Sequence, residues 1–253
     1  MTRFKLVLEY DGAGFVGWQR QANGVGVQQA VEEAVHAFSG EAPTVIAAGR
    51  TDSGVHALGQ VAHVDIEKNV PAGTVRDALN HFLRPRGVAV VGAEAVADDF
   101  HARFSATERG YLYRILSRRA PPALDRGRVW WVPMALDAQA MQAGARHLVG
   151  RHDFTAFRAS ECQADSPVKT LDHLAVTRDG EEIRITARAL SFLHNQMRII
   201  AGTLKVVGQG KFTPDDVARA RDARARSAAG PTGPPEGLYL THVGYGTQTD
   251  SSR

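Results

Sequence analysis

The order of hydrophobic patterns along this 253-residue chain constrains its fold more than any other feature. Apolar residues that alternate with polar ones predict strands, and apolar residues that recur every three to four positions predict helices. In the first half of the chain these patterns follow one another in the order β-α-β-β-α-β, which is typical of the ferredoxin-like split unit. The predicted strands are 3–10, 44–48, 60–66 and 88–96, and the predicted helices are 27–38 and 75–82.

The second half repeats this order, with predicted strands 111–117, 170–177, 182–189 and 237–245, helices 137–149 and 197–207, and an extra Arg-rich helix at 214–226. The sequence therefore predicts an α+β fold of two ferredoxin-like βαββαβ halves related by a pseudo-twofold axis. We expect mainly antiparallel sheets, helices on one face and a basic central cleft. The expected domains are an N-terminal half at 1–105 and a C-terminal half at 106–253, which ends in a flexible polar tail, TQTDSSR.

Several features of composition narrow the class of protein. Cys162 is the only cysteine, so neither an internal disulfide nor a thiolate metal cluster can form within one chain. No apolar run approaches the roughly 20 residues of a membrane span, and the N-terminus lacks a secretory signal pattern. Phosphate-binding loops, dinucleotide fingerprints and metal-ligand spacings are missing as well. We therefore expect a cytoplasmic protein with no membrane association, no cofactor and no metal.

The basic residues are mostly arginines, although the formal net charge is only +3. Arginine presents a planar fork of donors that suits phosphate groups. Several lie close together: Arg84 and Arg86 in one segment, and Arg103, Arg109, Arg114, Arg118, Arg119, Arg126 and Arg128 in another. Such clusters are typical of a surface that follows a phosphate backbone, but an ordinary solvated face would have the same composition.

The segment AGRTDSGVHA, residues 47–56, is strongly polar and lies between two predicted strands. This position puts Asp52 near a strand end, where a scaffold can hold a side chain firmly. Arg50 is expected to pair with the Asp52 carboxylate and keep it ionised. An ionised, oriented carboxylate can act as a nucleophile or as a base. The alternative is a turn framed by Gly49 and Gly54 with one surface ion pair.

Three further segments favour a functional role for this loop. EYDGAGFVGWQRQ follows the first strand, and SFLHNQMRIIAG sets His194 and Arg198 one helical turn apart. HARFSATERGYLYR interleaves arginines with Phe104, Tyr111 and Tyr113, an arrangement that suits base stacking beside phosphate contacts. The alternative for the two tyrosines is packing in the core.

These motifs occur in a characteristic order. AGRTDSGVHA, with YDG and GWQRQ before it, is followed by DDFHARFSAT, YLYR, HDFTAFR, FLHNQMRIIAG and PPEGLYL. The whole set, which runs from residue 9 to about residue 245, resembles the bacterial tRNA pseudouridine synthase A family.

The resemblance implies an isomerase that converts uridine to pseudouridine at positions 38, 39 and 40 of the tRNA anticodon stem-loop. The N1–C1′ bond breaks, the uracil turns, and C5 joins C1′ without any cofactor. By the resemblance, Asp52 is the catalytic carboxylate, acting as nucleophile or base at the ribose of a flipped-out nucleotide. Arg50 and Arg198 are the substrate-binding positions expected to hold Asp52 in place, and Tyr111 is expected to stack on the uracil. The resemblance also implies a homodimer.

Two other functions remain open at this point. One is a non-catalytic RNA-binding protein, in which Asp52→Asn would leave the RNA function intact. The other is a hydrolase that uses Asp52 together with His56 and turns over a small substrate without RNA.

Overall fold

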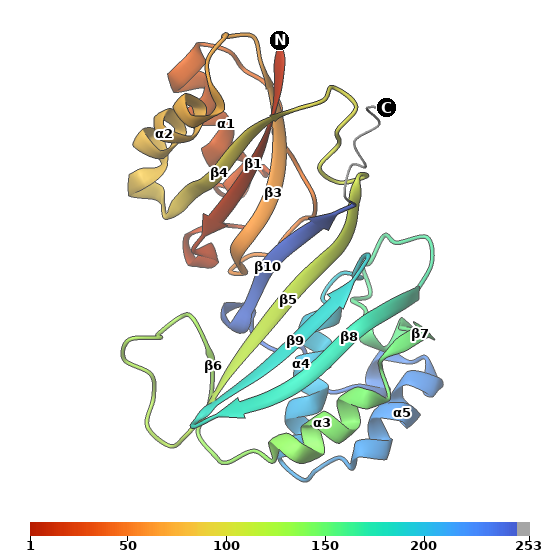
Figure 1. The fold of residues 1–253 in the computed structure, drawn as a ribbon. Helices are drawn as coiled ribbons and strands as arrows, with labels where there is room; N and C mark the ends of the chain where they lie inside the picture. Colours follow the sequence, from red (N-terminus) through yellow and green to blue (C-terminus); the bar gives the residue numbers. More distant parts are fainter. Residues whose placement is uncertain (247–253) are drawn as a thin grey trace. The chain divides into compact units, whose positions relative to one another are not determined.

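The computed structural model describes residues 1–246, so the predicted flexible tail TQTDSSR lies outside the described residues. The described chain divides into two compact units. The first unit consists of Met1–Arg109 together with 240–246, and the second is the continuous segment Gly110–Tyr239 (Figure 1). The domain boundary expected between residues 105 and 106 stays a prediction.

The first unit is built on an antiparallel sheet. β1 (Thr2–Tyr10) pairs with both β3 (His56–Ile66) and β4 (Val88–Val96), which gives the order β4-β1-β3. The two-residue strand β2 (Ile46–Ala47) pairs with β3, and β10 (Leu238–Tyr245) is also a neighbour of β3.

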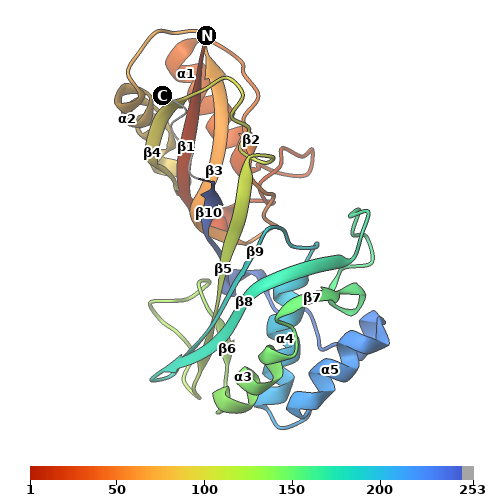
Figure 2. The ribbon, with the colours of Figure 1, turned by 45° about the vertical axis from the view of Figure 1, so that its right-hand side comes forward.

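Two helices, α1 (Val27–Ser39) and α2 (Ala72–Leu83), cover one face of this sheet (Figures 1 and 2). Phe4, Leu6 and Leu8 alternate along β1 and are buried. Alternate side chains of a strand point to one face of a sheet, so these three form the sheet side of the core. The buried residues of α1 and α2 recur at helical spacing and form its other side.

The second unit combines strands with three helices. β5 (Ala106–Ser117), β9 (Glu182–Ala189), β8 (Val168–Asp179) and β7 (Gly150–Asp153) are neighbours in that order, and β6 (Trp130–Val132) pairs in parallel with β5. α3 (Ala138–Arg146) packs against β8 and contacts α4 (Gln196–Gly208) and α5 (Pro214–Ala223). Most residues of α4 are buried, which explains why its sequence is apolar on nearly every side.

Single-turn 3-10 helices supplement these elements at Gly12–Gly14, Arg84–Arg86, Thr155–Phe157, Arg226–Ala228 and Pro235–Gly237. Within residues 1–246, no helix is both long enough and apolar enough to cross a membrane.

The predicted α+β class is confirmed, with a mostly antiparallel sheet. The pseudo-twofold axis and the basic cleft stay predictions. Some elements differ in length from the sequence prediction. β3 begins at His56 rather than at residue 60, so the end of the polar segment belongs to a strand. α5 ends at Ala223, because Arg224 adopts a left-handed conformation (φ 50°) that terminates the helix.

Candidate functional site

The loop between β2 and β3, residues 48–55, is here called the GRTD loop. Two buried side chains of the neighbouring strands hold its first half. The Tyr10 hydroxyl lies 2.8 Å from Thr51 Oγ1, and Gln60 Nε2 donates to Gly49 O at 2.8 Å. Gln60 Nε2 also lies 3.4 Å from the Tyr10 hydroxyl, so the two side chains form one network. Arg50, between the two anchored residues, is exposed.

The glycines of the N-terminal segment bring its backbone against the GRTD loop. Trp18 N donates to Thr51 O at 3.0 Å. Gly17 has a φ of 109°, and a Cβ at this position would stand 2.8 Å from Thr51 O. A Cβ on Gly12 would come within 2.1 Å of Val55 O. Both positions therefore require glycine, which explains the YDG and GW motifs in physical terms.

His56 anchors the other end of the GRTD loop. Its side chain is buried, with only 2% of the residue exposed. Its Nδ1 accepts a hydrogen bond from Gly12 N at 3.0 Å. The Asp11 carboxylate oxygen Oδ1 lies 3.2 Å from the same nitrogen and accepts a hydrogen bond from Ala13 N. His56 therefore supports the loop from inside, and its ring is not available at the surface.

Asp52 sits on a tight turn in the middle of this anchored loop. Val55 N donates to Asp52 O at 3.1 Å, and Gly54 takes the left-handed conformation (φ 77°) that the turn requires. Asp52 is half-buried between the buried residues Thr51 and Val55. The backbone thus fixes the position of a partly accessible carboxylate. Its pairing with Arg50 stays a prediction.

The other two predicted site residues belong to the second unit. Tyr111 lies on β5, half-buried, with its ring edge-on to Phe192 at 4.9 Å between centroids. Arg198 lies on α4, and its guanidinium donates to Gly233 O and to Asn195 Oδ1, both at 2.8 Å. These two bonds fix the direction in which the Arg198 side chain points.

Tyr113 is the tyrosine that packs in the core. It is completely buried, and its hydroxyl donates to Pro234 O at 2.7 Å. A Cβ on Gly233 would stand 2.6 Å from that hydroxyl, so the PTGPPEG segment needs glycine where it crosses Tyr113. The same segment positions both Tyr113 and Arg198.

The structure thus brings Arg50 and Asp52 together on one anchored loop of the first unit, and places Tyr111 and Arg198 in the second unit. Sequence reasoning missed Tyr10, Gln60 and the role of Gly233. A signal for Gln60 exists, because it is a polar residue within a mostly apolar strand segment, QVAHV.

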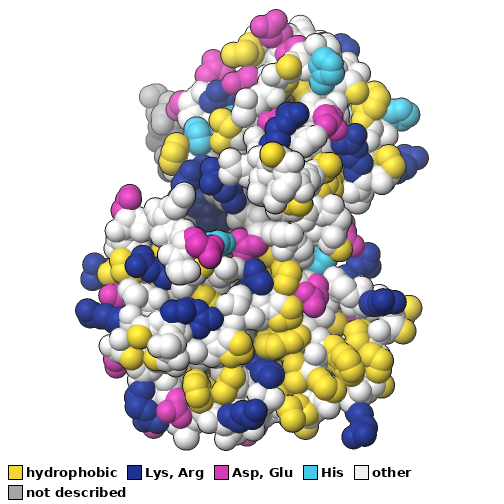
Figure 3. Space-filling model, turned by 180° about the vertical axis from the view of Figure 1, so that it is seen from behind, with side chains coloured by type: hydrophobic (Ala, Val, Ile, Leu, Met, Phe, Trp, Pro, Cys, Tyr) yellow, Lys and Arg dark blue, Asp and Glu magenta, His cyan; other side chains and the backbone are white. Residues whose placement is uncertain are grey.

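Three of the clustered arginines and two arginines of α5 are engaged with carboxylates. Arg114 forms a two-bond pair with Glu182, with N–O distances of 3.0 and 2.9 Å, and these bonds lower the pKa of Glu182 to about 2. Arginine–carboxylate ion pairs are also formed by Arg86–Glu33, Arg118–Glu181, Arg219–Asp216 and Arg221–Asp222. Figure 3 shows lysine and arginine side chains of the second unit dispersed among acidic and hydrophobic ones. These pairs are what an ordinary solvated face contains.

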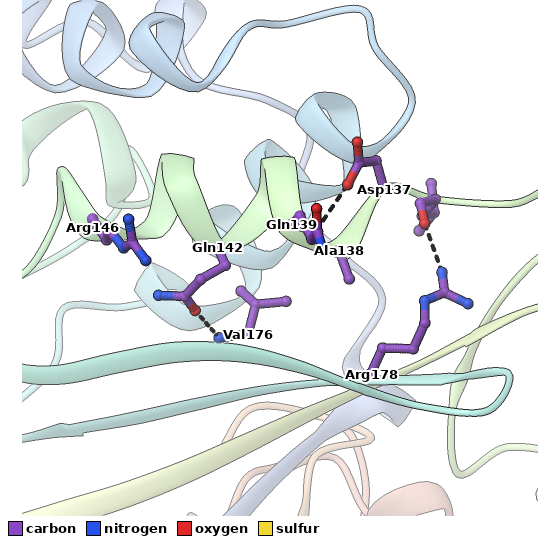
Figure 4. A pocket seen from close by; sticks show the side chains of 8 residues that line it. Asp137, Ala138, Gln139, Gln142, Arg146, Val176 and Arg178 are labelled. Atoms are coloured by element: carbon purple, nitrogen blue, oxygen red, sulfur yellow. Dashed lines mark hydrogen bonds between the residues drawn. The ribbon is translucent and has the colours of Figure 1, made fainter.

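A pocket of about 620 Å³ lies between α3 and β8 in the second unit (Figure 4). Gln142 Oε1 accepts from Val176 N at 2.5 Å across it, and Arg178 Nη2 donates to Leu136 O at 2.6 Å. Its lining includes none of the residues predicted from the sequence. In the part of the chain that the structure describes, no group of three or more His, Cys, Asp or Glu residues could hold a metal ion.

Comparisons with known proteins agree on one family. The model of the family described as tRNA pseudouridine synthase matches residues 6–105 and 145–246. A protein from Paramagnetospirillum magneticum named tRNA pseudouridine synthase A is 62% identical over 97% of this chain and 96% of its own length. Proteins of the same name from Rhodospirillum centenum and Rhizobium leguminosarum bv. trifolii are 62% and 58% identical, covering 97% of this chain and 100% and 92% of their own lengths.

Among solved structures, a chain of "Crystal Structure of a Cbf5-Nop10-Gar1 Complex" is similar with 11% identity and a TM-score of 0.33. The match covers 96% of this chain and 59% of that chain.

Proposed function

Since this chain belongs to the tRNA pseudouridine synthase family, we propose that Asp52 is its catalytic carboxylate and that it acts at positions 38, 39 and 40 of the anticodon stem-loop. The protein is an isomerase that converts uridine in tRNA to pseudouridine. The N1–C1′ bond breaks and a C5–C1′ bond forms, so the only atom lost from the uracil is the hydrogen on C5, which goes to water while N1 gains one. The atoms balance without an external group.

The chemistry of the ribose explains the need for a carboxylate. Breaking a glycosidic bond develops positive charge at C1′, which an anion can stabilise or capture. The same carboxylate could instead remove a proton from the sugar as a base. The observation that carries the proposal is the placement of Asp52, which is partly accessible on a turn whose neighbours are held by Tyr10, Gln60 and His56.

The remaining roles follow from the chemistry of each side chain. Arg50 is exposed and precedes Asp52 by two positions in the sequence. It is proposed to bind the substrate backbone and to favour the ionised form of the Asp52 carboxylate. Tyr111 is proposed to stack on the uracil, and Arg198, whose direction Gly233 and Asn195 fix, is proposed to orient the Asp52 carboxylate in the tRNA complex. A homodimeric state and a cytoplasmic location complete the proposal.

The two alternatives account for the site less well. A hydrolase that uses His56 would need that ring at the surface, but it is buried and bonded to Gly12 N. A non-catalytic RNA-binding protein has no use for an anchored carboxylate, since a negative charge disfavours phosphate binding.

The test uses tRNA transcripts that carry tritium at C5 of uridine, because formation of the C5–C1′ bond must release this label to water. We expect the wild-type chain to release tritium. We expect Asp52→Asn to lose at least about a hundredfold in rate, as is usual when a catalytic acid or base is removed. Asp172→Asn, an exposed residue of β8, is the matched control and should release label like the wild type.

Gel shifts with the same transcripts separate binding from chemistry. Asp52→Asn should still bind tRNA. Label release by Asp52→Asn at the wild-type rate would exclude this residue as the catalytic group. Firm binding by the wild type with no release from any transcript would favour the non-catalytic alternative.

A further inference from the structure

Residues 97–105 join β4 to β5 in the first unit (Figure 1). This connection carries an exposed aromatic ring, Phe104. Phe104 is 76% exposed, twice as much as Phe82 (38%) on the same unit. Single exposed apolar residues are common on protein surfaces, so exposure alone does not indicate a ligand. The surroundings of the ring distinguish Phe104 from such residues.

The backbone beside Phe104 is fixed by two buried or half-buried side chains. Ala102 N donates to His63 Nδ1 at 3.1 Å, and the Tyr245 hydroxyl donates to Ala102 O at 2.8 Å. Burial lowers the pKa of His63 to about 4, so its ring is neutral and can accept this bond. Ser105 N also donates to His101 O at 2.9 Å. The exposed ring therefore stands on an ordered turn.

Arg109 connects this turn to the GRTD loop. Its Nη2 donates to Arg103 O at 2.9 Å and to Ala48 O at 2.7 Å. Ala48 is the first residue of the GRTD loop, so one guanidinium joins the segment that carries Phe104 to the segment that carries Asp52. A substrate bound at Asp52 and a group bound at Phe104 can thus belong to one molecule.

The ring of Phe104 ends a series of three aromatic rings in contact. His63 meets His101 edge-on, with centroids 4.9 Å apart and planes inclined by 64°, whereas the centroids of His101 and Phe104 are 4.4 Å apart with planes inclined by only 32°. His101 thus covers one side of Phe104. The Arg103 guanidinium lies over the Phe104 ring, 5.6 Å from its centroid, which is within the range of a cation–π contact. Phe104 is nevertheless 76% exposed, so most of its surface is accessible to a ligand.

We propose that Phe104 is a stacking site for an unpaired nucleobase of the tRNA substrate, which extends the series of His63 and His101. This inference rests on the proposed function. An exposed aromatic ring in contact with an arginine is a usual platform for single-stranded nucleic acid. A target uridine that leaves its stack exposes its neighbours, and a protein ring that replaces the lost stacking offsets part of that cost.

The charges of residues 97–105 indicate whether this segment contacts the bases or the phosphates of the tRNA. Asp98 and Asp99 lie on the same connection as Arg103, so the segment as a whole offers no excess of positive charge for phosphates. The contribution of Phe104 is therefore stacking, and it should depend little on salt. Stacking of one base on an aromatic side chain contributes about 1–3 kcal/mol, which corresponds to roughly 5- to 150-fold in affinity.

The test compares Phe104→Leu with Phe104→Tyr in the full-length chain, by tRNA affinity in gel shifts at several salt concentrations. We expect Phe104→Leu, which keeps the apolar volume but removes the π face, to weaken binding at least about fivefold with an unchanged salt slope. Phe104→Tyr should bind like the wild type. Phe82→Leu, which changes an exposed phenylalanine next to a histidine ring on the same unit, is the matched control and should leave affinity unchanged.

A second readout reports stacking directly. On tRNA binding, the tryptophan fluorescence of Phe104→Trp should fall more than that of the wild type. The fluorescence of Phe82→Trp should fall no more than that of the wild type. Wild-type affinity of Phe104→Leu, or no loss of fluorescence in Phe104→Trp, would overturn the proposal. So would a change of oligomeric state in Phe104→Leu, measured by light scattering, since this would assign the ring to a contact between two copies of the chain.

Failure of this inference and failure of the proposed function give different results. If the wild type releases tritium from C5-labelled tRNA but Phe104→Leu binds normally, only the stacking site is excluded. If the wild type binds tRNA without release and Phe104→Leu still weakens binding, the stacking site stands and the isomerase assignment of Asp52 is excluded.

Discussion

The environment of Gln60 indicates how the GRTD loop is held in place. Among buried side-chain atoms of residues 1–246, its Oε1 is the one without a hydrogen-bond partner. The amide cannot simply turn over, because Nε2 must face Gly49 O. An unsatisfied buried acceptor costs about 1–3 kcal/mol. We infer that Gln60, which holds Gly49 O and contacts Tyr10, helps to position Asp52.

Replacing Gln60 should therefore affect the reaction more than the fold. In Gln60→Met the orphan acceptor disappears while the bond to Gly49 O is lost, so the two effects on stability oppose each other. We expect the melting temperature to change by only a few degrees. The maximal rate of tritium release should fall about tenfold or more, with little change in the tRNA concentration needed for half-maximal rate. An unchanged maximal rate would show that Gln60 does not position the loop.

At the scale of elements, the sequence predicts the helices and strands that are long enough to show a hydrophobic pattern, and little else. The bounds of β4 and β9 agree with the prediction to the residue. β9 has a clear alternation of apolar and polar residues, and β4 is a run of valines and small residues between turn signals. β6 and β7 have only three and four residues, which is too short to show a period. The anchors of the GRTD loop were also out of reach. Thr51 contacts Tyr10 from 41 positions away, and a pattern within one segment does not identify its partner in another.

The four arginines of α5 and of the turn that follows it provide a prediction at this scale. Arg219 pairs with Asp216, and Arg224 lies 3.4 Å from the Asp153 carboxylate. Arg221 donates to His147 O and Arg226 to Gly230 O. Because these side chains are engaged within the unit, replacing all four with glutamine should lower the melting temperature and leave the salt dependence of tRNA binding nearly unchanged. If the four contact phosphates instead, the slope of log K against log salt should fall by about 3 to 4.

At the scale of the whole molecule, the first unit is discontinuous and the second is one uninterrupted segment. β10 is the piece that returns to the first unit. Val243 and Tyr245 pack against a core of Ala48, Val61 and Ala102. A Cβ on Gly59 would stand 2.4 Å from Thr241 O, so the two backbones are in close contact. The first unit therefore lacks part of its core until β10 is added.

This arrangement predicts different behaviour of the two units as fragments. A chain of residues 110–239 contains every described residue of the second unit, and we expect it to unfold cooperatively in thermal melts followed by circular dichroism. A chain of residues 1–109 lacks the Tyr245 bond to Ala102 O and the packing of Val243. We expect this fragment to melt broadly or to be unfolded, and addition of a peptide of residues 238–246 should sharpen its transition. A cooperative melt of 1–109 alone, at the midpoint of the full chain, would contradict this account.

The late return of β10 also has a consequence during synthesis on the ribosome. At about 5–20 residues per second, the roughly 130 residues of the second unit take on the order of 10 s to emerge after the first unit. Throughout that interval the nascent first unit has the GRTD loop but not the strand that packs against Ala48. A tRNA-modifying enzyme made in this order is completed only when translation has passed β10, although the ribosome that makes it is surrounded by its substrate.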